Sequence, residues 1–356
     1  MSIIDIFPSF VLRLFAQAIT KLSGVILKAR FLYSIPVIGK QLNKKYSKSK
    51  FRDWLQIVLR GPISHKEFIV SWRLLTDKNL RKRKKLLAEV KDASSTYQVE
   101  DGFLKVNKEV FSEIPRLAEV CKEIIKEKGY DRSSIGNHDK SNIKKLSHLT
   151  KASYFTDILT LEDLYKHPEI MEFALSKKFA SIAFKHLEYL PQLTSVGLKI
   201  SPVNDTQKGS PNFHFDSRAG HIKCFINIFD VSEEGGPFTF LDKKKTNEFV
   251  DEHESYSDRK MDLEKLLEYE KNFARNSSGP SGSGIICETS ECIHYGGRVK
   301  DQTRVMLSLH YCDYMSCFWH PSKGIFSEIW IKDFPELREH FSQDEFSREL
   351  LRLDHF

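Results

Sequence analysis

The sequence predicts an α+β protein in which short strands form a sandwich or barrel with helices before and after them. From about residue 194 onward, short runs with strand-like alternation are separated by turn residues. Residues 161–187 and the chain after Trp319 instead show the three-and-four spacing of amphipathic helices. The 26 Phe, 12 Tyr and 4 Trp also favour a β-rich interior.

The domain organisation follows from length and from changes in composition along the chain. A chain of 356 residues that is 40% hydrophobic can bury the core of one large domain. We expect a basic helical extension at residues 1–95, a main domain at 96–320 and a helical tail at 321–356. A charged, helix-like insertion at about 242–276 interrupts the strands of the main domain.

The N-terminal extension is strongly basic. Residues 1–100 carry 20 Lys and Arg against 7 Asp and Glu, whereas the remaining residues carry 35 against 41. Charged residues interrupt its apolar helical face, so no uncharged run reaches the roughly 20 residues that a bilayer span requires. Two alternatives remain: residues 1–52 bind an anionic membrane surface, or their helix packs on its own domain. The basic run 81–85 has no interleaved aromatic residue and does not favour nucleic-acid binding.

The elements of the main domain can be placed in order. A strand is expected within residues 97–106, a helix within 110–130, a polar loop at 130–150, and two helices at about 161–167 and 168–187. The predicted strands that follow are TSVGLKIS, PNFHFDS, IKCFINIFDV, PFTFLD, GIICETS and TRVMLSLHY.

The cysteines indicate a reduced protein. There is no CxxC pair and no dense framework of the kind that small secreted domains use. We therefore interpret the six cysteines as buried, reduced thiols of a cytoplasmic protein. They are Cys121, Cys224, Cys287, Cys292, Cys312 and Cys317.

A candidate metal site begins at His214-Phe215-Asp216. On a strand, residues two apart point to one face, which would place an imidazole beside a carboxylate. Two histidines and one carboxylate on one face of the metal are the ligand set of non-haem Fe(II) oxygenases. His294 is the best candidate for the second histidine, because it follows a predicted strand and precedes two glycines that permit a close turn.

Arg304 is the candidate anion-binding residue. It lies ten residues after His294, at the start of a predicted strand, and a guanidinium can bind a carboxylate through two parallel hydrogen bonds. Ser308 falls on the same strand face, so its hydroxyl could assist.

These motifs, together with GGP at 235–237, resemble the phytanoyl-CoA dioxygenase-like family of Fe(II)/2-oxoglutarate-dependent oxygenases. The resemblance covers roughly residues 97–315, from DGFLKV through NFHFDS and CIHYGGR to TRVMLSLHY. It implies a double-stranded β-helix (jelly roll, cupin-like) core. It also implies a hydroxylation that consumes 2-oxoglutarate and O2 and releases succinate and CO2, acting on a small-molecule or lipid- or sugar-type substrate.

The resemblance also implies residue roles. His214, Asp216 and His294 would hold Fe(II), and Arg304 would hold the far carboxylate of 2-oxoglutarate. We add Lys199 and Lys223 as candidates for cosubstrate contacts, because each lies on a predicted strand flanking His214-Phe215-Asp216, the HxD motif. We expect three further histidines, His221, His310 and His320, to be structural or exposed rather than ligands.

Two other functions fit the same residues. A cupin-like metal enzyme could use His214, Asp216 and His294 (the triad) without 2-oxoglutarate. Arg304 is the residue that distinguishes this alternative from a 2-oxoglutarate-dependent enzyme. Alternatively, the chain could be an inactive oxygenase-fold adaptor that binds anionic membranes through its N-terminus. The intact ligand set argues against this second alternative.

Overall fold

The structure is a computed structural model. It describes residues 80–91, 96–130, 156–185, 187, 190–203, 213–216, 220–253, 263–300, 302–312 and 329–351. One compact unit comprises Lys82–Asp354 with Phe356, and the other comprises Met1–Arg81 with His355. The segment expected to bind membranes, residues 1–52, lies outside the described residues, as do His320 and Cys317. None of the helices described is long and apolar enough to cross a bilayer.

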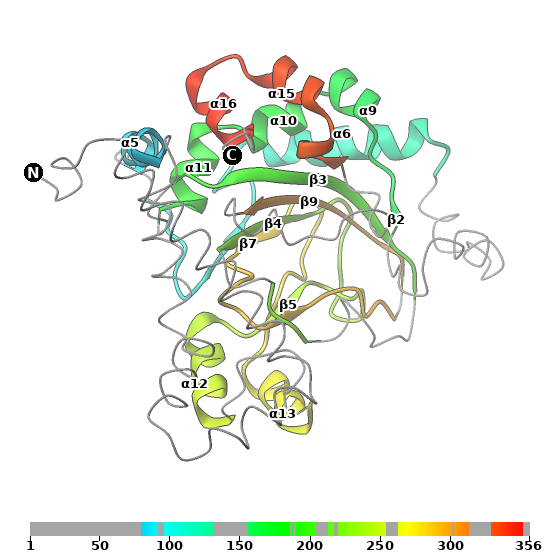
Figure 1. The fold of residues 1–356 in the computed structure, drawn as a ribbon. Coiled ribbons are helices and arrows are strands. Elements are labelled where there is room, and N and C mark those ends of the chain that lie inside the picture. The colour runs from blue at the N-terminus through cyan, green and yellow to red at the C-terminus, as the bar shows by residue number, and fades with distance from the viewer. Residues whose placement is uncertain are drawn as a thin grey trace, which may run out of the picture. The chain divides into compact units, whose positions relative to one another are not determined.

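Two antiparallel sheets form the centre of the larger unit (Figure 1). The larger sheet has the order β1-β7-β4-β9-β3-β10, with β2 also paired to β3, and the smaller sheet has the order β6-β5-β8. The strands are β1 (Phe103–Val106), β2 (Thr156–Asp157), β3 (Gln192–Ser201), β4 (His221–Asn227), β5 (Thr239–Phe240), β6 (Arg275–Asn276), β7 (Gly284–Cys287), β8 (His294–Tyr295), β9 (Arg304–Cys312) and β10 (Ile329–Trp330). The mixture of helices and antiparallel strands agrees with the predicted α+β class.

Helices lie on both sides of this pair of sheets (Figure 1). They are α5 (Leu80–Lys91), α6 (Ile114–Glu127), α9 (Leu161–Lys166), α10 (Glu169–Ala174), α11 (Lys177–Ala183), α12 (Lys243–His253), α13 (Leu263–Phe273), α15 (Pro335–Phe341) and α16 (Glu345–Leu351), with a short 3₁₀ helix, η2 (Ile331–Asp333). The helix predicted at 168–187 is divided into α10 and α11. Ser176 begins the second helix, because its hydroxyl accepts a hydrogen bond from the backbone N–H of Phe179.

The two faces of the large sheet differ in chemistry because side chains alternate along each strand. On β9, Val305, Leu307, Leu309 and Tyr311 join the main hydrophobic core together with the helices. The other β9 face belongs to the space between the sheets, where Met306 packs in one cluster with Phe238 and Phe240 of the β5 region. The polar residues of β9 therefore lie between the two sheets.

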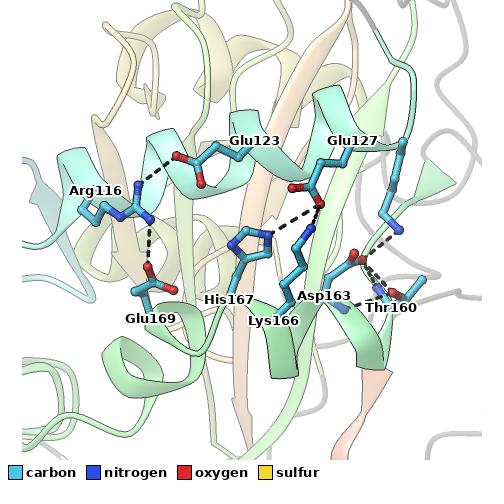
Figure 2. A network of polar contacts seen from close by, with 9 residues as sticks. Arg116, Glu123, Glu127, Thr160, Asp163, Lys166, His167 and Glu169 are labelled. Atoms are coloured by element: carbon cyan, nitrogen blue, oxygen red, sulfur yellow. Dashed lines mark hydrogen bonds and ion pairs between the residues drawn. The ribbon is translucent and has the colours of Figure 1, made fainter.

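Polar contacts connect the helices that cover the apolar face (Figure 2). Arg116 of α6 bonds Glu123 of the same helix at 2.9 Å and Glu169 of α10 at 3.0 Å. Lys166 of α9 bonds Glu127 of α6 at 2.7 Å. These pairs are exposed, so each contributes little to stability and the apolar contacts below them dominate.

The ends of the described region are also part of the packed unit. In α5, Arg83 is 2% exposed and donates to the carbonyl of Leu190, while Lys82 pairs with Glu349 of α16 at 3.0 Å. At the other end, β10 pairs with β3. Part of the basic run 81–85 is therefore used inside the protein, and the C-terminal region adds a strand as well as helices.

The core beneath the helices predicts a stability effect. Phe179 is fully buried and its ring stacks on Tyr311 and Phe111, with centroids 5.2 and 5.8 Å away. We expect Phe179→Ala to lower the free energy of unfolding by about 3–5 kcal/mol, because it leaves a cavity. Urea unfolding measures this value. The control, Lys166→Ala, removes only an exposed lysine and should leave this value nearly unchanged, and equal effects of the two substitutions would contradict this packing.

Candidate metal centre

The structure brings together the three residues that the sequence singled out. Their ligand atoms all lie within 4.8 Å of one another. His214 and His294 form an isolated antiparallel bridge, with two backbone hydrogen bonds of 3.0 Å, and their rings are 4.3 Å apart between centroids. Nε2 of His294 lies 3.8 Å from Oδ2 of Asp216.

The local structure around the HxD motif differs from the predicted strand. Within the described residues 213–216 there is only the single bridge to His294, and Asp216 N–H donates to the carbonyl of Thr289 at 3.0 Å. The segment pairs for too short a distance to form a ladder. His214 and Asp216 nevertheless reach one site, because each end of the segment is held by a backbone hydrogen bond.

The electrostatics of the centre favour an ionised carboxylate. Burial by itself would raise the pKa of Asp216, but the positive charge of Lys223 and, to a smaller extent, the nearby histidine rings outweigh it and hold the pKa well below its usual range. Nζ of Lys223 lies 2.7 Å from Oδ2 of Asp216. The ammonium group is thus the cation that neutralises this partly buried acid.

His294 is held as a neutral imidazole. Burial, followed by the charge of His214, lowers its pKa to about 3. Its Nδ1 lies 2.9 Å from the carbonyl of Cys292, a contact that requires the proton on Nδ1 and leaves the lone pair on Nε2, the nitrogen near Asp216. A neutral imidazole and an ionised carboxylate are the protonation states that metal binding needs. The donor set therefore fits a non-haem Fe(II) centre.

Arg304 is a buried cation without an acidic partner. It is 5% exposed, and its guanidinium donates to the carbonyl of Gly236 and, at 3.3 Å, to the hydroxyl of Ser201. Among the residues described, no carboxylate lies within ion-pair distance of it, and its Nε makes no hydrogen bond. Burial lowers its pKa to about 10, so it stays charged at neutral pH. An uncompensated buried charge is costly, and an anionic ligand would compensate it.

Gly296, two residues after His294, lies beside the guanidinium of Arg304 and so relates Arg304 to the triad. A Cβ at Gly296 would lie 3.8 Å from Nη2 of Arg304. Gly236, which accepts the hydrogen bond from Arg304, has a φ of +66°, and a Cβ there would lie 2.7 Å from the backbone N of Val299. The GGP turn therefore requires glycine in order to place a carbonyl on the guanidinium.

The other predicted contact residues lie on the same inner face of the large sheet. Ser308 stands opposite Gly197 of β3 and Phe225 of β4, and Lys199 stands opposite Met306. Lys223 reaches Asp216 directly. No local pattern in the sequence marks Ser201, because its hydrogen bond with Arg304 depends on the pairing of β3 with β9.

The insertion at 242–276 contacts the neighbours of both histidines. Tyr295, next to His294, donates its hydroxyl hydrogen bond to Glu270 of α13, and Arg298 pairs with the same carboxylate at 3.1 Å. The Arg298 guanidinium lies 3.5 Å from the centroid of the Tyr295 ring, whose centroid is 4.8 Å from that of Phe213. Helix α13 thus supports the segments that carry His214 and His294.

Comparison with known proteins gives only weak similarities. No protein-family model and no curated protein matches the chain. Similar solved structures include the non-haem α-ketoglutarate-dependent epimerase SnoN from nogalamycin biosynthesis, at 14% identity, 66% coverage of this chain, 84% of SnoN and a TM-score of 0.36. HygX from Streptomyces hygroscopicus, with nickel and 2-oxoglutarate bound, has 12% identity, coverages of 59% and 82% and a TM-score of 0.33. EctD from S. alaskensis has 13% identity, coverages of 60% and 74% and a TM-score of 0.39.

The Lys223–Asp216 ion pair predicts a competition. A divalent cation that binds Asp216 must displace the ammonium, so we expect Lys223→Met to bind Mn²⁺ more tightly, by roughly tenfold or more. Isothermal titration calorimetry of the metal-free protein measures this affinity. The control is Lys105→Met, on the exposed β1 position, which should leave the affinity unchanged. Weaker Mn²⁺ binding by Lys223→Met would contradict the competition.

Proposed function

We propose that the chain is an Fe(II)- and 2-oxoglutarate-dependent oxygenase of the phytanoyl-CoA dioxygenase-like type, with a jelly-roll core. The observation that carries this proposal is the pairing of a two-histidine, one-carboxylate cluster with a buried arginine that has no acidic partner. The cluster is the ligand set of Fe(II) oxygenases. The arginine supplies a positive charge that the carboxylate at the far end of the cosubstrate would neutralise.

The proposal assigns a role to each residue. His214, Asp216 and His294 would hold Fe(II). Bound Fe(II) and 2-oxoglutarate supply the oxygen-activating chemistry, with succinate and CO2 as products. Arg304 and Ser201 bind the distal carboxylate, with Ser308 farther along the same strand face. Asp216 supplies the carboxylate ligand that this type of oxygenase uses for hydroxylation. The proposed reaction is therefore hydroxylation of a small-molecule or lipid- or sugar-type substrate.

Aromatic side chains of the two sheets supply the water-excluding wall. The ring of Phe238 lies 5.3 Å from that of His294 and 4.4 Å from that of Phe225, between centroids. Phe225 is the β4 neighbour of Ser308. These rings lower the local polarity between the metal ligands and Arg304, which strengthens the attraction of Arg304 for a carboxylate.

A metal enzyme of cupin type that does not use 2-oxoglutarate would need the triad but not Arg304. Anaerobic addition of Fe(II) and then 2-oxoglutarate therefore tests the proposal, because the iron chelate of the keto acid has a visible charge-transfer absorption. We expect this band in the unaltered protein. Its absence, with iron bound, would contradict 2-oxoglutarate dependence.

Removal of the guanidinium should separate metal binding from cosubstrate binding. We expect Arg304→Ala to retain Fe(II) but to bind 2-oxoglutarate more weakly by about 2–5 kcal/mol, since one partner of a buried charge pair is lost. Titration of the same charge-transfer band measures the affinity. The matched control is Arg275→Ala, a half-exposed arginine that pairs with Asp242. Unchanged affinity in Arg304→Ala would remove Arg304 from this role.

A further inference from the structure

A second group of metal-binding side chains lies on the inner face of the large sheet, apart from the triad. We call it the His/Cys cluster, and it consists of His221, His310 and Cys312, whose ligand atoms also lie within 4.8 Å of one another. Nδ1 of His221 is 2.7 Å from Nε2 of His310, and Sγ of Cys312 is 3.4 Å from the first and 3.1 Å from the second. The three residues are 1–6% exposed. The sequence predicts that both histidines are structural or exposed, and the structure buries both beside a thiol.

Strand register explains why these residues converge. His221 at the start of β4 pairs with Cys312 at the end of β9, and His310 precedes Cys312 by two residues on the same face. The cluster therefore spans the two central strands of the sheet where β4 begins and β9 ends. The adjacent strand β3 continues the row, because Gln192 pairs with Cys312.

Gln192 gives the independent indication of a ligand. Its side chain is fully buried, on the same face as Cys312, and neither its amide oxygen nor its amide nitrogen makes a hydrogen bond within the described residues. Buried amides without partners are uncommon in native proteins, and each one costs free energy. A cation beside Cys312 would give the Gln192 oxygen a partner.

We propose that His221, His310 and Cys312 bind a thiophilic transition-metal ion of the Zn²⁺ class, with Gln192 beside it as a further oxygen donor. Thiolate and imidazole are the ligands that select such ions, whereas the triad has a carboxylate and no sulfur. The ion would join β3, β4 and β9 at one end of the sheet. Lys223, which is two residues after His221 and reaches Asp216, lies between the two sites.

The cluster needs only small movements to bind such an ion. Ligands about 2.0–2.3 Å from a tetrahedral cation are roughly 3.3–3.8 Å apart. The two distances to Cys312, 3.4 and 3.1 Å, are close to this range, and only the imidazole nitrogens, at 2.7 Å, must separate by more than a few tenths of an ångström. Rotation of either imidazole about its side-chain bonds supplies this separation.

Cobalt titration of the full chain tests the proposal. The protein is reduced, stripped with a chelator and titrated with Co²⁺, which gives a thiolate-to-cobalt charge-transfer absorption in the near ultraviolet only where a cysteine is a ligand. We expect this band in the unaltered protein, and its loss on addition of excess Zn²⁺. Cys312→Ser and His310→Gln should lose the band together with one equivalent of bound Co²⁺.

Two control variants separate this proposal from the other possibilities. Cys224→Ser removes an equally buried thiol from the opposite face of β4 and should retain the band. Asp216→Ala should also retain it, so that failure of the triad as a metal site leaves this result unchanged. Absence of the band in the unaltered protein, or its persistence in Cys312→Ser, would overturn the proposal and leave a hydrogen-bonded structural cluster.

Discussion

Alternation of side chains along β9 is the constraint on which the rest of the structure depends. Its odd-numbered residues, from Val305 to Tyr311, fill the core under the helices. Its even-numbered residues, from Arg304 to Cys312, therefore face the second sheet. A single strand thus carries the buried arginine at one end and the His/Cys cluster at the other. A shift of one residue in its pairing would exchange the two faces and bury charge in the apolar core.

The polar residues between the two sheets lower the stability of the fold. Apolar burial beneath the layer of helices offsets this unfavourable free energy. Asp216, Lys223 and Arg304 place three charges between the sheets, where each must be paired or hydrogen-bonded. Asp216 and Lys223 compensate one another, whereas Arg304 has only a carbonyl and a hydroxyl. Departures from an apolar interior of this kind are expected at functional sites, because binding rather than folding requires them. The aromatic contacts around Phe179 and Tyr311, on the opposite face, supply the compensating burial.

Much of the fold could be predicted from periodicity, because it is a local property. The strands β3, β4, β7 and β9 and the helices α6 and α9 lie where alternation or three-and-four spacing placed them. The sequence also predicts the contact between His214-Phe215-Asp216 and His294, since metal chemistry restricts which residue types can meet. Over the described residues 213–216, a single bridge from His214 to His294 stands where the sequence predicts a strand.

What could not be predicted depends on register between distant strands. Ser201 meets Arg304 across 103 residues, and His221 meets Cys312 across 91 residues. Neither pair has a spacing that distinguishes it in the sequence. Tertiary packing likewise decides where α10 ends and α11 begins, at Ser176. It also decides the strand β10, because two residues are too few to produce a periodic signal in the sequence.

In the proposed site, two imidazoles and a carboxylate bind iron, and the nearby thiol does not. The iron K-edge X-ray absorption fine structure of the anaerobic protein with one equivalent of Fe(II) distinguishes these ligands. We expect nitrogen and oxygen scatterers only, at about 2.0–2.2 Å, with the outer-shell features of two imidazoles. A sulfur scatterer at about 2.3 Å would contradict this ligand set, because it would place iron at Cys312 instead of at Asp216.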